Sequence, residues 1–297
     1  TAFDPEAYRA GRQTPVFFGS ALTNFGVEPF YDAFIAEAAA PGPRRATRIT
    51  GEEITVDPLV QPFSGYVFKI QANMDPRHRD SLAFVRICSG MFERDLVVKQ
   101  VRRGAIVREL RLSRPNTLVA RSRTTLDVAY PGDVVGFVNS GFAIGDTLLV
   151  GGADQAFLYP PLPSFPPEVF ARIQPKDLTK RKSFDKGIAQ LASEGAIQIL
   201  RPADNPTAVP FVAAVGRLQF DVLAYRLQDE YGVETEIQPI AYSCSGWLKG
   251  DRETFRPTPG SQLCEDARGQ LVVLFPSPWD KTYCERENPQ HSFAEYA

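Results

Sequence analysis

The residue types that could bind a phosphorylated nucleotide are present, but not at the spacing this chemistry needs. A phosphate-binding loop has the pattern Gly-x-x-x-x-Gly-Lys-Ser/Thr, in which backbone N–H groups and one lysine surround the phosphates. Lysine precedes serine or threonine only at Lys182-Ser183 and Lys281-Thr282, and neither pair follows a glycine. The Asn-Lys-x-Asp motif for guanine specificity does not occur either. We therefore expect these 297 residues neither to bind GTP tightly nor to hydrolyse it.

Cysteine and histidine are too few and too scattered for a metal site or for nucleophilic catalysis. A zinc site needs clustered ligands. The only histidines are His78, which lies among arginines, and His291, near the end of the sequence. The cysteines lie far apart and form no Cys-x-x-Cys pair: Cys88, Cys244, Cys264 and Cys284. We expect no catalytic residue, no bound metal and free thiols.

Positive charge is concentrated in one part of a chain whose net charge is −2. From Arg77 to Arg123, eleven arginines and one lysine stand against four carboxylates, which gives a net charge of +8 in 47 residues. Such a stretch suits an RNA backbone, because neutralising phosphates releases counterions. The alternative is a β-domain with arginine-rich exposed faces and no nucleic-acid partner.

Length and hydropathy indicate a multidomain protein outside the membrane. A chain of 297 residues has room for two or three domains. No apolar run reaches the roughly 18 residues that a membrane helix needs. Thr1 to Glu6 is acidic and contains proline, unlike a signal peptide. We expect a cytoplasmic monomer that contacts no membrane.

The first section of the chain predicts a strand, a loop and a helix. Val16 to Phe18 reads as an apolar strand that runs into Gly19 to Leu22. Apolar residues then recur at helical spacing from about Glu28, and Pro41-Gly42-Pro43 ends the helix. The residues from Arg44 to Pro58 are either a polar linker or an edge segment.

The second section, 63–159, predicts a small closed β-barrel. Short strands at regular spacing, broken by glycine and proline, are typical of such barrels. Tyr159 to Pro167 holds five prolines in nine residues and predicts a stiff interdomain linker. The expected strands are 64–71, 82–88, 95–101, 117–120, 134–138 and 147–150.

The third section predicts a ferredoxin-like α+β domain, because strands and helices follow one another in the order βαββαβ. The strands are 169–173, 197–200, 209–215 and 233–240, and the helices are 178–192 and 218–231. On the second helix Arg226 is expected at the surface. A strand near 247–248, a strand at 271–275 and a helix at 279–285 could follow. The core residues expected on the second helix are Leu218, Phe220, Leu223 and Leu227.

Four stretches carry a resemblance to known proteins: Gly19 to Leu22, Gln61 to Asp80, Gln190 to Pro202 and Val215 to Val222. The first resembles the last base-recognition loop of translational GTPases. The second is similar to the opening of the barrel domain, and the last two resemble the third domain, of one such family, bacterial peptide chain release factor three. The matches run from Thr14 to about Trp247 in the family's order.

The resemblance implies the C-terminal part of such a factor, lacking most of the G domain. The implied fold is a remnant of an α/β G domain with a linker over 1–57, a β-barrel of the translation-factor domain-two type over 58–159, and a third domain over 160–297. The third domain is ferredoxin-like to about residue 240 and then extended.

In function, the resemblance implies the ribosome-binding part of a translation-termination GTPase that promotes dissociation of codon-reading release factors after peptide release. The resemblance implies that full-length members bind GTP or GDP with magnesium as cofactors. We expect the fragment itself to bind no cofactor. The implied partners are small-subunit RNA and proteins and, indirectly, class I release factors.

Two groups of residues follow as site candidates. The residual nucleotide-contacting residues are Ser20, Ala21 and Leu22, since the alanine amide of that loop meets the guanine carbonyl in the family. The loop at Asn139 to Ile144 is one residue shorter than the family pattern and lacks its usual histidine. The candidates for ribosomal RNA contact are Arg77, His78, Arg79, Arg86 and Arg94.

Three alternatives remain open at the level of the sequence. The chain could be a stand-alone RNA-binding barrel protein, although the first section has no evident use there. It could be a fragment of another translational GTPase such as elongation factor G, but only 57 residues follow Ile240, too few for that factor's two further domains. It could be an unrelated enzyme of the α/β section, for which no catalytic set is convincing.

Overall fold

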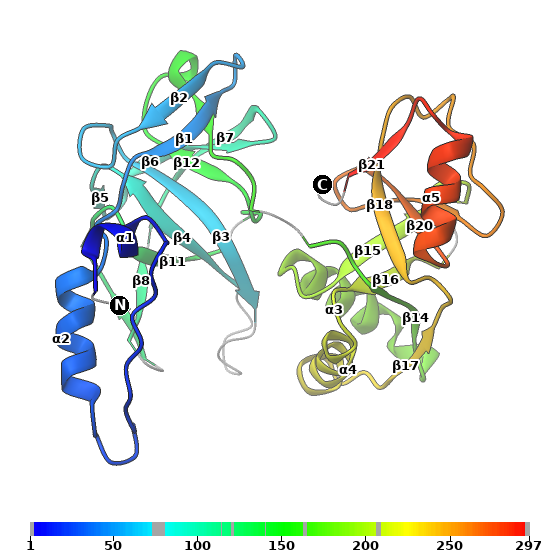
Figure 1. The fold of residues 1–297 in the computed structure, drawn as a ribbon, viewed down its shortest axis with the longest axis horizontal. Helices are drawn as coiled ribbons and strands as arrows, with labels where there is room; N and C mark the ends of the chain where they lie inside the picture. The colour runs from blue at the N-terminus through cyan, green and yellow to red at the C-terminus, as the bar shows by residue number, and fades with distance from the viewer. Residues whose placement is uncertain are drawn as a thin grey trace.

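The computed structural model describes residues 3–72, 81–113, 115–119, 122–139, 141–162, 165–205 and 209–294, which form two lobes (Figure 1). The first lobe, blue to green, contains the N-terminal helices and a curled β-sheet. The second, yellow-green to red, contains the α/β section and the C-terminal strands. In the described residues no helix is long and apolar enough to span a bilayer.

The N-terminal segment holds two helices joined by an extended stretch. Helix α1 (Pro5–Arg9) begins at Asp4, whose carboxylate accepts hydrogen bonds from the N–H groups of Glu6 and Ala7. Helix α2 (Val27–Glu37) has no buried residue. The strand predicted at Val16 to Phe18 is wrong: these residues join no ladder in the described structure, and extended backbone becomes a strand only when another strand pairs with it.

Residues 44–58, for which the sequence left two possibilities, form a hairpin. Strands β1 (Arg44–Arg48) and β2 (Glu53–Val56) are antiparallel, and β1 also pairs with β13 (Phe157–Leu158). Ala46 and Val56 are buried against Tyr66, Cys88 and Tyr159. The segment is thus a small sheet with β2 at its edge, packed on the barrel.

The barrel is one eight-stranded sheet curled around a single core, in the order β7-β6-β12-β3-β4-β11-β8-β9 over the described residues. The core is formed by residues such as Val67, Val85, Val98, Val135 and Leu148. No ladder joins the edges β7 and β9 in the described part, so the expected closed barrel is seen there as a curled sheet whose described ladders do not close. The strands are β3 (Ser64–Ala72), β4 (Ser81–Ser89), β6 (Val97–Arg102), β7 (Ala105–Arg111), β8 (Asn116–Val119), β9 (Ser122–Thr125), β11 (Val134–Val138) and β12 (Thr147–Leu149), with a separate pair, β5 (Phe92–Glu93) and β10 (Val128–Ala129).

The start of the proline-rich linker is fastened to the barrel by two tyrosines. The hydroxyls of Tyr159 and Ser64 are hydrogen-bonded at 2.7 Å, and the Leu162 N–H donates to the Tyr66 hydroxyl at 3.1 Å. Burial raises the pKa of Tyr159 well above its usual range, so its hydroxyl stays protonated. A 3₁₀ turn, η1 (Ala153–Gln155), precedes this anchor.

The third domain has the predicted βαββαβ order. Its four strands pair antiparallel in the order β17-β14-β16-β15, and both helices lie against one face, where Leu191 and Val212 share a core. A 3₁₀ turn, η2 (Leu178–Lys180), occupies the start of the first predicted helix. The elements are β14 (Val169–Pro175), α3 (Arg181–Ser193), β15 (Gln198–Pro202), β16 (Phe211–Ala214), α4 (Leu218–Tyr231) and β17 (Thr235–Pro239).

Helix α4 corrects two expectations. Phe220, Leu223 and Leu227 are buried as predicted, but Leu218 is 74% exposed, because it lies on the opposite side of the helix from this stripe. Arg226 is not a free surface residue: its side chain is only 19% exposed and is held between Glu194 and Glu230. Arg226 lies beside the apolar stripe and forms an ion pair with Glu194, which follows helix α3. The spacing of residues within α4 alone cannot predict a contact with another segment.

The residues after 241 extend the same sheet beyond β15, in the order β15-β19-β20-β18-β21 (Figure 1). The two strands and the helix suggested by the sequence are present, and two further short strands complete the sheet. Trp247, Val272 and Leu274 pack against Phe170 and Leu200 of the ferredoxin-like sheet, so the extension is part of the domain. The elements are β18 (Cys244–Lys249), β19 (Gln262–Glu265), β20 (Leu271–Phe275), α5 (Pro278–Glu287) and β21 (Ser292–Ala294).

A hydrogen bond links the end of β3 in the barrel to the third domain. The Ala72 N–H, at the end of β3, donates to Glu194 Oε1 at 3.0 Å. Glu194 follows α3 and also binds Arg226 of α4, whose Nη1 lies 2.8 Å from Glu194 Oε2. Burial alone would lower the pKa of Arg226, but its bonds to Glu230 and Glu194 outweigh this effect and raise it. Arg226 therefore stays charged. The cluster of Glu194, Arg226 and Glu230 is called here the interdomain triad.

Candidate functional site

The loop from Gly19 to Gly26 presents backbone N–H groups to solvent. The Ser20 N–H donates to the Phe25 carbonyl at 2.9 Å and closes the loop. Gly26 has φ of +71°, and a Cβ there would collide with the Phe18 carbonyl oxygen, so only glycine fits. Leu22 is 95% exposed, and no hydrogen bond of the described residues uses the Ala21 N–H. The loop thus offers a fixed, unused donor that could meet a ligand carbonyl.

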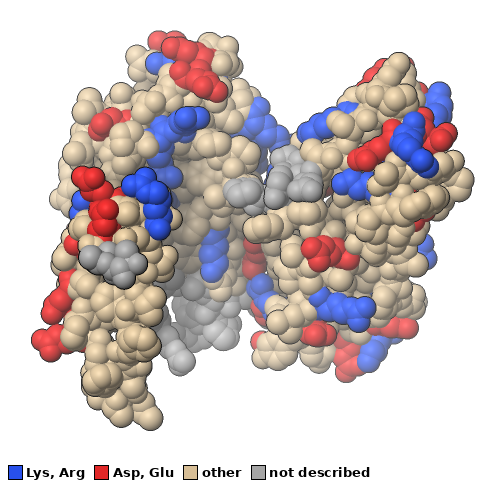
Figure 2. All heavy atoms as spheres, in the orientation of Figure 1, with Lys and Arg blue, Asp and Glu red and all other residues tan. Residues whose placement is uncertain are grey.

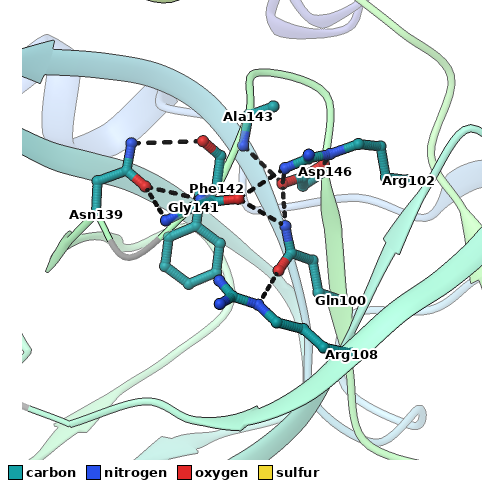
Figure 3. Close-up of polar contacts among 8 residues, drawn as sticks. All are labelled: Gln100, Arg102, Arg108, Asn139, Gly141, Phe142, Ala143 and Asp146. Atoms are coloured by element: carbon teal, nitrogen blue, oxygen red, sulfur yellow. Dashed lines mark hydrogen bonds and ion pairs between the residues drawn. The ribbon is translucent and has the colours of Figure 1, made fainter.

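A second loop, Asn139–Asp146, is held by a buried polar network (Figure 3). Asp146 is only 1% exposed. Its Oδ2 accepts hydrogen bonds from Gln100 Nε2 at 2.6 Å, from Arg102 Nη2 at 2.8 Å and from the Ala143 N–H at 2.7 Å. Its Oδ1 accepts from Arg102 Nε at 2.7 Å. A buried carboxylate tolerates loss of water when it is paired and fully hydrogen-bonded, as here.

The same network fixes the tip of this loop. Asn139 Oδ1 accepts from the N–H groups of Gly141 at 2.9 Å and Phe142 at 2.7 Å, and the Gly141 carbonyl accepts from Arg102. Arg108 donates to Gln100 and lies over the Phe142 ring, as Figure 3 shows. These contacts suit a rigid binding loop and provide no acid, base or nucleophile for catalysis.

The predicted RNA-contact residues are placed only in part. Arg77, His78 and Arg79 lie outside the described residues. Arg94 is half-exposed and pairs with Asp127 at 2.6 Å. Arg86, in the middle of β4, is half-buried near the Cys88 thiol, and its Nε has no hydrogen-bond partner in the described part of the chain. The two arginines therefore come from different parts of the barrel.

Other cations of the barrel are more accessible than Arg86, and the sequence reasoning did not single them out. Arg103 is in the turn between β6 and β7, and Arg111 ends β7; both are exposed without an ion pair among the described residues. Exposed and half-buried residues alternate along β7, which points Arg111 outward, but the sequence of 105–111 has no apolar–polar alternation that would have predicted it. On the face seen in Figure 2, positive and negative side chains are interspersed.

The thiols and acidic residues of the described structure do not form a reactive or metal-binding site. All four cysteines are free. Burial raises the pKa of the Cys264 thiol to about 12 and also raises that of Cys88 and Cys244, so these three stay protonated at neutral pH. Among the described residues no group of His, Cys, Asp and Glu could hold a metal ion.

Family comparisons match the two main units of the fold. Residues 62–151 match the model of elongation factor G domain 2, and residues 159–285 match that of the C-terminal domain of class II release factor RF3. The first match covers the curled barrel, and the second covers the ferredoxin-like sheet with most of the extension.

Sequence relatives extend the match to nearly the whole chain. Peptide chain release factor 3 of Synechocystis is 50% identical over 94% of the chain and 50% of its own length. The protein of the same name from Synechococcus elongatus is 46% identical over 98% of the chain and 51% of its own length. The chain is thus similar to peptide chain release factor 3 over nearly all of its own length.

The resemblance seen in the sequence is thereby confirmed for this family. The chain spans about half the length of the release factor 3 relatives it matches. A crystal structure of a Thermus thermophilus protein aligns with 88% of the chain and 37% of its own, at a TM-score of 0.59 and 20% identity, which supports the fold alone. The residues after Trp247, which lie beyond the resemblance seen in the sequence, fall largely within the matched release-factor domain.

Proposed function

We propose that the chain is the ribosome-binding part of a translation-termination GTPase, which promotes dissociation of codon-reading release factors after peptide release. The observation that carries this proposal is the order of the two matched regions, an elongation factor G domain 2 followed by a release-factor C-terminal domain. The second match favours this factor over elongation factor G and over a stand-alone RNA-binding barrel protein. Action on the ribosome would place the protein in the cytoplasm.

The first section is proposed as a remnant of the GTP-binding domain over 1–57, ahead of the barrel at 58–159 and the third domain at 160–297. Helix α2 supports this reading, because Tyr31, Phe34 and Ile35 are 56%, 57% and 76% exposed. With Phe3 and Phe17 it borders an apolar groove of about 930 Å³. Surfaces of this kind are normally covered, here by the rest of a nucleotide domain.

Ser20, Ala21 and Leu22 would then be the guanine-contacting residues of the full-length protein. The unused Ala21 N–H supports this role, since a rigid backbone donor suits a base carbonyl. GTP or GDP with magnesium would bind mainly through residues that this chain does not contain. The isolated chain would therefore serve in docking, with no catalysis of its own.

Titration of the isolated chain with GTP or GDP is expected to show no tight binding. The phosphate cradle supplies most of the positioning and charge stabilisation in such enzymes, and the chain has none. Isothermal calorimetry measures this directly, with ATP as the control nucleotide. A submicromolar affinity for either guanine nucleotide would contradict the prediction.

Binding of the chain to purified ribosomes is expected to weaken as salt rises, because arginines of the barrel would contact phosphates. Replacing both Arg77 and Arg79 with alanine should lower the affinity and flatten the log–log salt dependence by about two units, one per phosphate contact. Arg94→Ala should have a smaller effect, since Arg94 is already paired with Asp127. An unchanged affinity and slope in the double variant would remove this segment from the interface.

A further inference from the structure

One face of the third domain's sheet carries a polar hollow of about 470 Å³. Arg172 of β14 lines it, whereas Ala171, the residue before it, packs with the two helices. Since side chains alternate along a strand, the hollow lies on the face away from α3 and α4. The C-terminal strands cover a neighbouring part of this face, where Trp247 packs with Phe170. A hollow of this size can hold a small ligand.

An unpaired cation and a carboxylate line opposite sides of the hollow. Arg172 is exposed, lies over the Phe211 ring with its Cζ 5.5 Å from the centroid, and has no hydrogen bond or ion pair among the described residues. Asp204, which follows β15, accepts a hydrogen bond from Gln262 Nε2 at 3.1 Å through Oδ1. Its Oδ2 has no partner in the described structure. Because β16 lies between β14 and β15, a ligand above β16 could contact both charged groups.

The rest of the lining is apolar or is held in place by hydrogen bonds. Gln174 and Gln238 donate their amide N–H groups to Glu236 at 3.0 and 3.1 Å, which leaves both carbonyl oxygens without a partner among the described residues. A ligand that suits the hollow therefore has an apolar face, accepts hydrogen bonds beside Arg172 and donates them beside Asp204. The apolar lining consists mainly of Pro202, Val209 and Phe211.

The guanine base meets each of these requirements. Its O6 and N7 atoms accept hydrogen bonds from an arginine, and its N1–H and 2-amino groups can donate to a carboxylate. We propose that the hollow binds an unpaired guanine base between Arg172 and Asp204, with Pro202 and Val209 against the ring. A free guanine nucleotide and a single-stranded RNA both offer this base. The inference does not rest on the proposed ribosome binding.

The charges of the hollow disfavour other ligands. Adenine carries an amino group where guanine has O6, so it would place a donor against the guanidinium of Arg172. Asp204 would repel a phosphate group, and Arg172 would repel a lysine side chain. A purely apolar ligand would leave the polar lining without hydrogen bonds. A single base makes few contacts, so we expect weak binding, which agrees with the expected lack of submicromolar affinity for GTP and GDP.

The test titrates the full chain with the monophosphates GMP, IMP and AMP and follows binding by saturation-transfer NMR, which detects weak ligands. GMP should bind most tightly. IMP lacks the 2-amino group and should bind about tenfold more weakly, the effect of losing part of a bidentate contact. AMP should bind more weakly than IMP, because it also lacks O6.

Two variants assign the contacts. Asp204→Asn should weaken GMP binding about tenfold and reduce the preference for GMP over IMP. Arg172→Gln should weaken GMP and IMP alike, because both keep O6 and N7. Both side chains are exposed, so the Tm of each variant should stay unchanged. The matched controls are Asp221→Asn and Arg217→Gln at exposed positions of the α4 segment, and these should leave the affinities unchanged.

An oligouridine that contains one guanosine separates the two sources of the base. Tighter binding of this oligomer than of GMP would identify RNA as the source. Binding of GMP together with no gain of the oligomer over plain oligouridine would identify a free nucleotide. Equal affinities for GMP and AMP would overturn the proposal, as would GMP binding that neither Asp204→Asn nor Arg172→Gln weakens. The proposal also falls if neither GMP nor the guanosine-containing oligomer binds.

Discussion

Replacing Trp247 with alanine is expected to destabilise the third domain by about 3–5 kcal/mol, the usual effect of removing a large buried aromatic side chain. Trp247 lies on β18 and is 2% exposed. It packs with Phe170 and Leu200 of the ferredoxin-like sheet, and its indole N–H donates to Asp266 at 3.3 Å. The cavity would open in the core that the C-terminal strands share with the ferredoxin-like strands, so the whole domain should unfold at lower denaturant concentration.

Trp279 provides the matched control for this experiment. It lies on α5, is 67% exposed and stacks on Tyr283, with ring centroids 5.5 Å apart. Trp279→Ala should therefore cost about 1 kcal/mol or less. Denaturant melts of both variants decide the matter. A mild effect of Trp247→Ala, similar to that of Trp279→Ala, would mean that the side chains of the C-terminal strands do not form a common core with those of the ferredoxin-like strands.

Elements with a strong internal pattern were predictable from the sequence. Helix α4 was placed at its observed bounds, because its inner stripe has helical spacing and Gly232 ends it in the left-handed conformation. The β3 and β4 strands followed from runs rich in β-branched and aromatic residues. The short strands β19 and β21 were missed, since three or four residues carry no detectable period and are held by their neighbours in the sheet.

Features that depend on distant partners were not predictable. Nothing near Asp146 in the sequence indicates that Gln100 and Arg102 bind it, because they are more than forty residues away. The expected strand at Val16 to Phe18 failed for the converse reason: its residues favour a strand, but the described chain gives it no partner strand. The guanine-loop residues could be nominated only through resemblance, since Gly-Ser-Ala-Leu alone is a common kind of turn.

Arg226→Ala is expected to destabilise the third domain by about 2–3 kcal/mol, although sequence periodicity placed this residue at the surface. The arginine holds Glu194, 5% exposed, and Glu230, 15% exposed, within hydrogen-bonding distance. Removing it would leave two poorly hydrated carboxylates without their cation, which costs more than the net worth of the pairs. The loss would approach that of Leu223→Ala, about 2–5 kcal/mol for a buried leucine.

Arg217, at the start of the same helix, is the matched control. It is exposed and without an ion pair in the described structure, so Arg217→Ala should change stability by less than about 0.5 kcal/mol. Denaturant melts of the three variants order the effects. If Arg226→Ala were as mild as Arg217→Ala, the interdomain triad would contribute nothing measurable. Glu194 would then keep its hydrogen bond to the Ala72 N–H without any measurable support from Arg226.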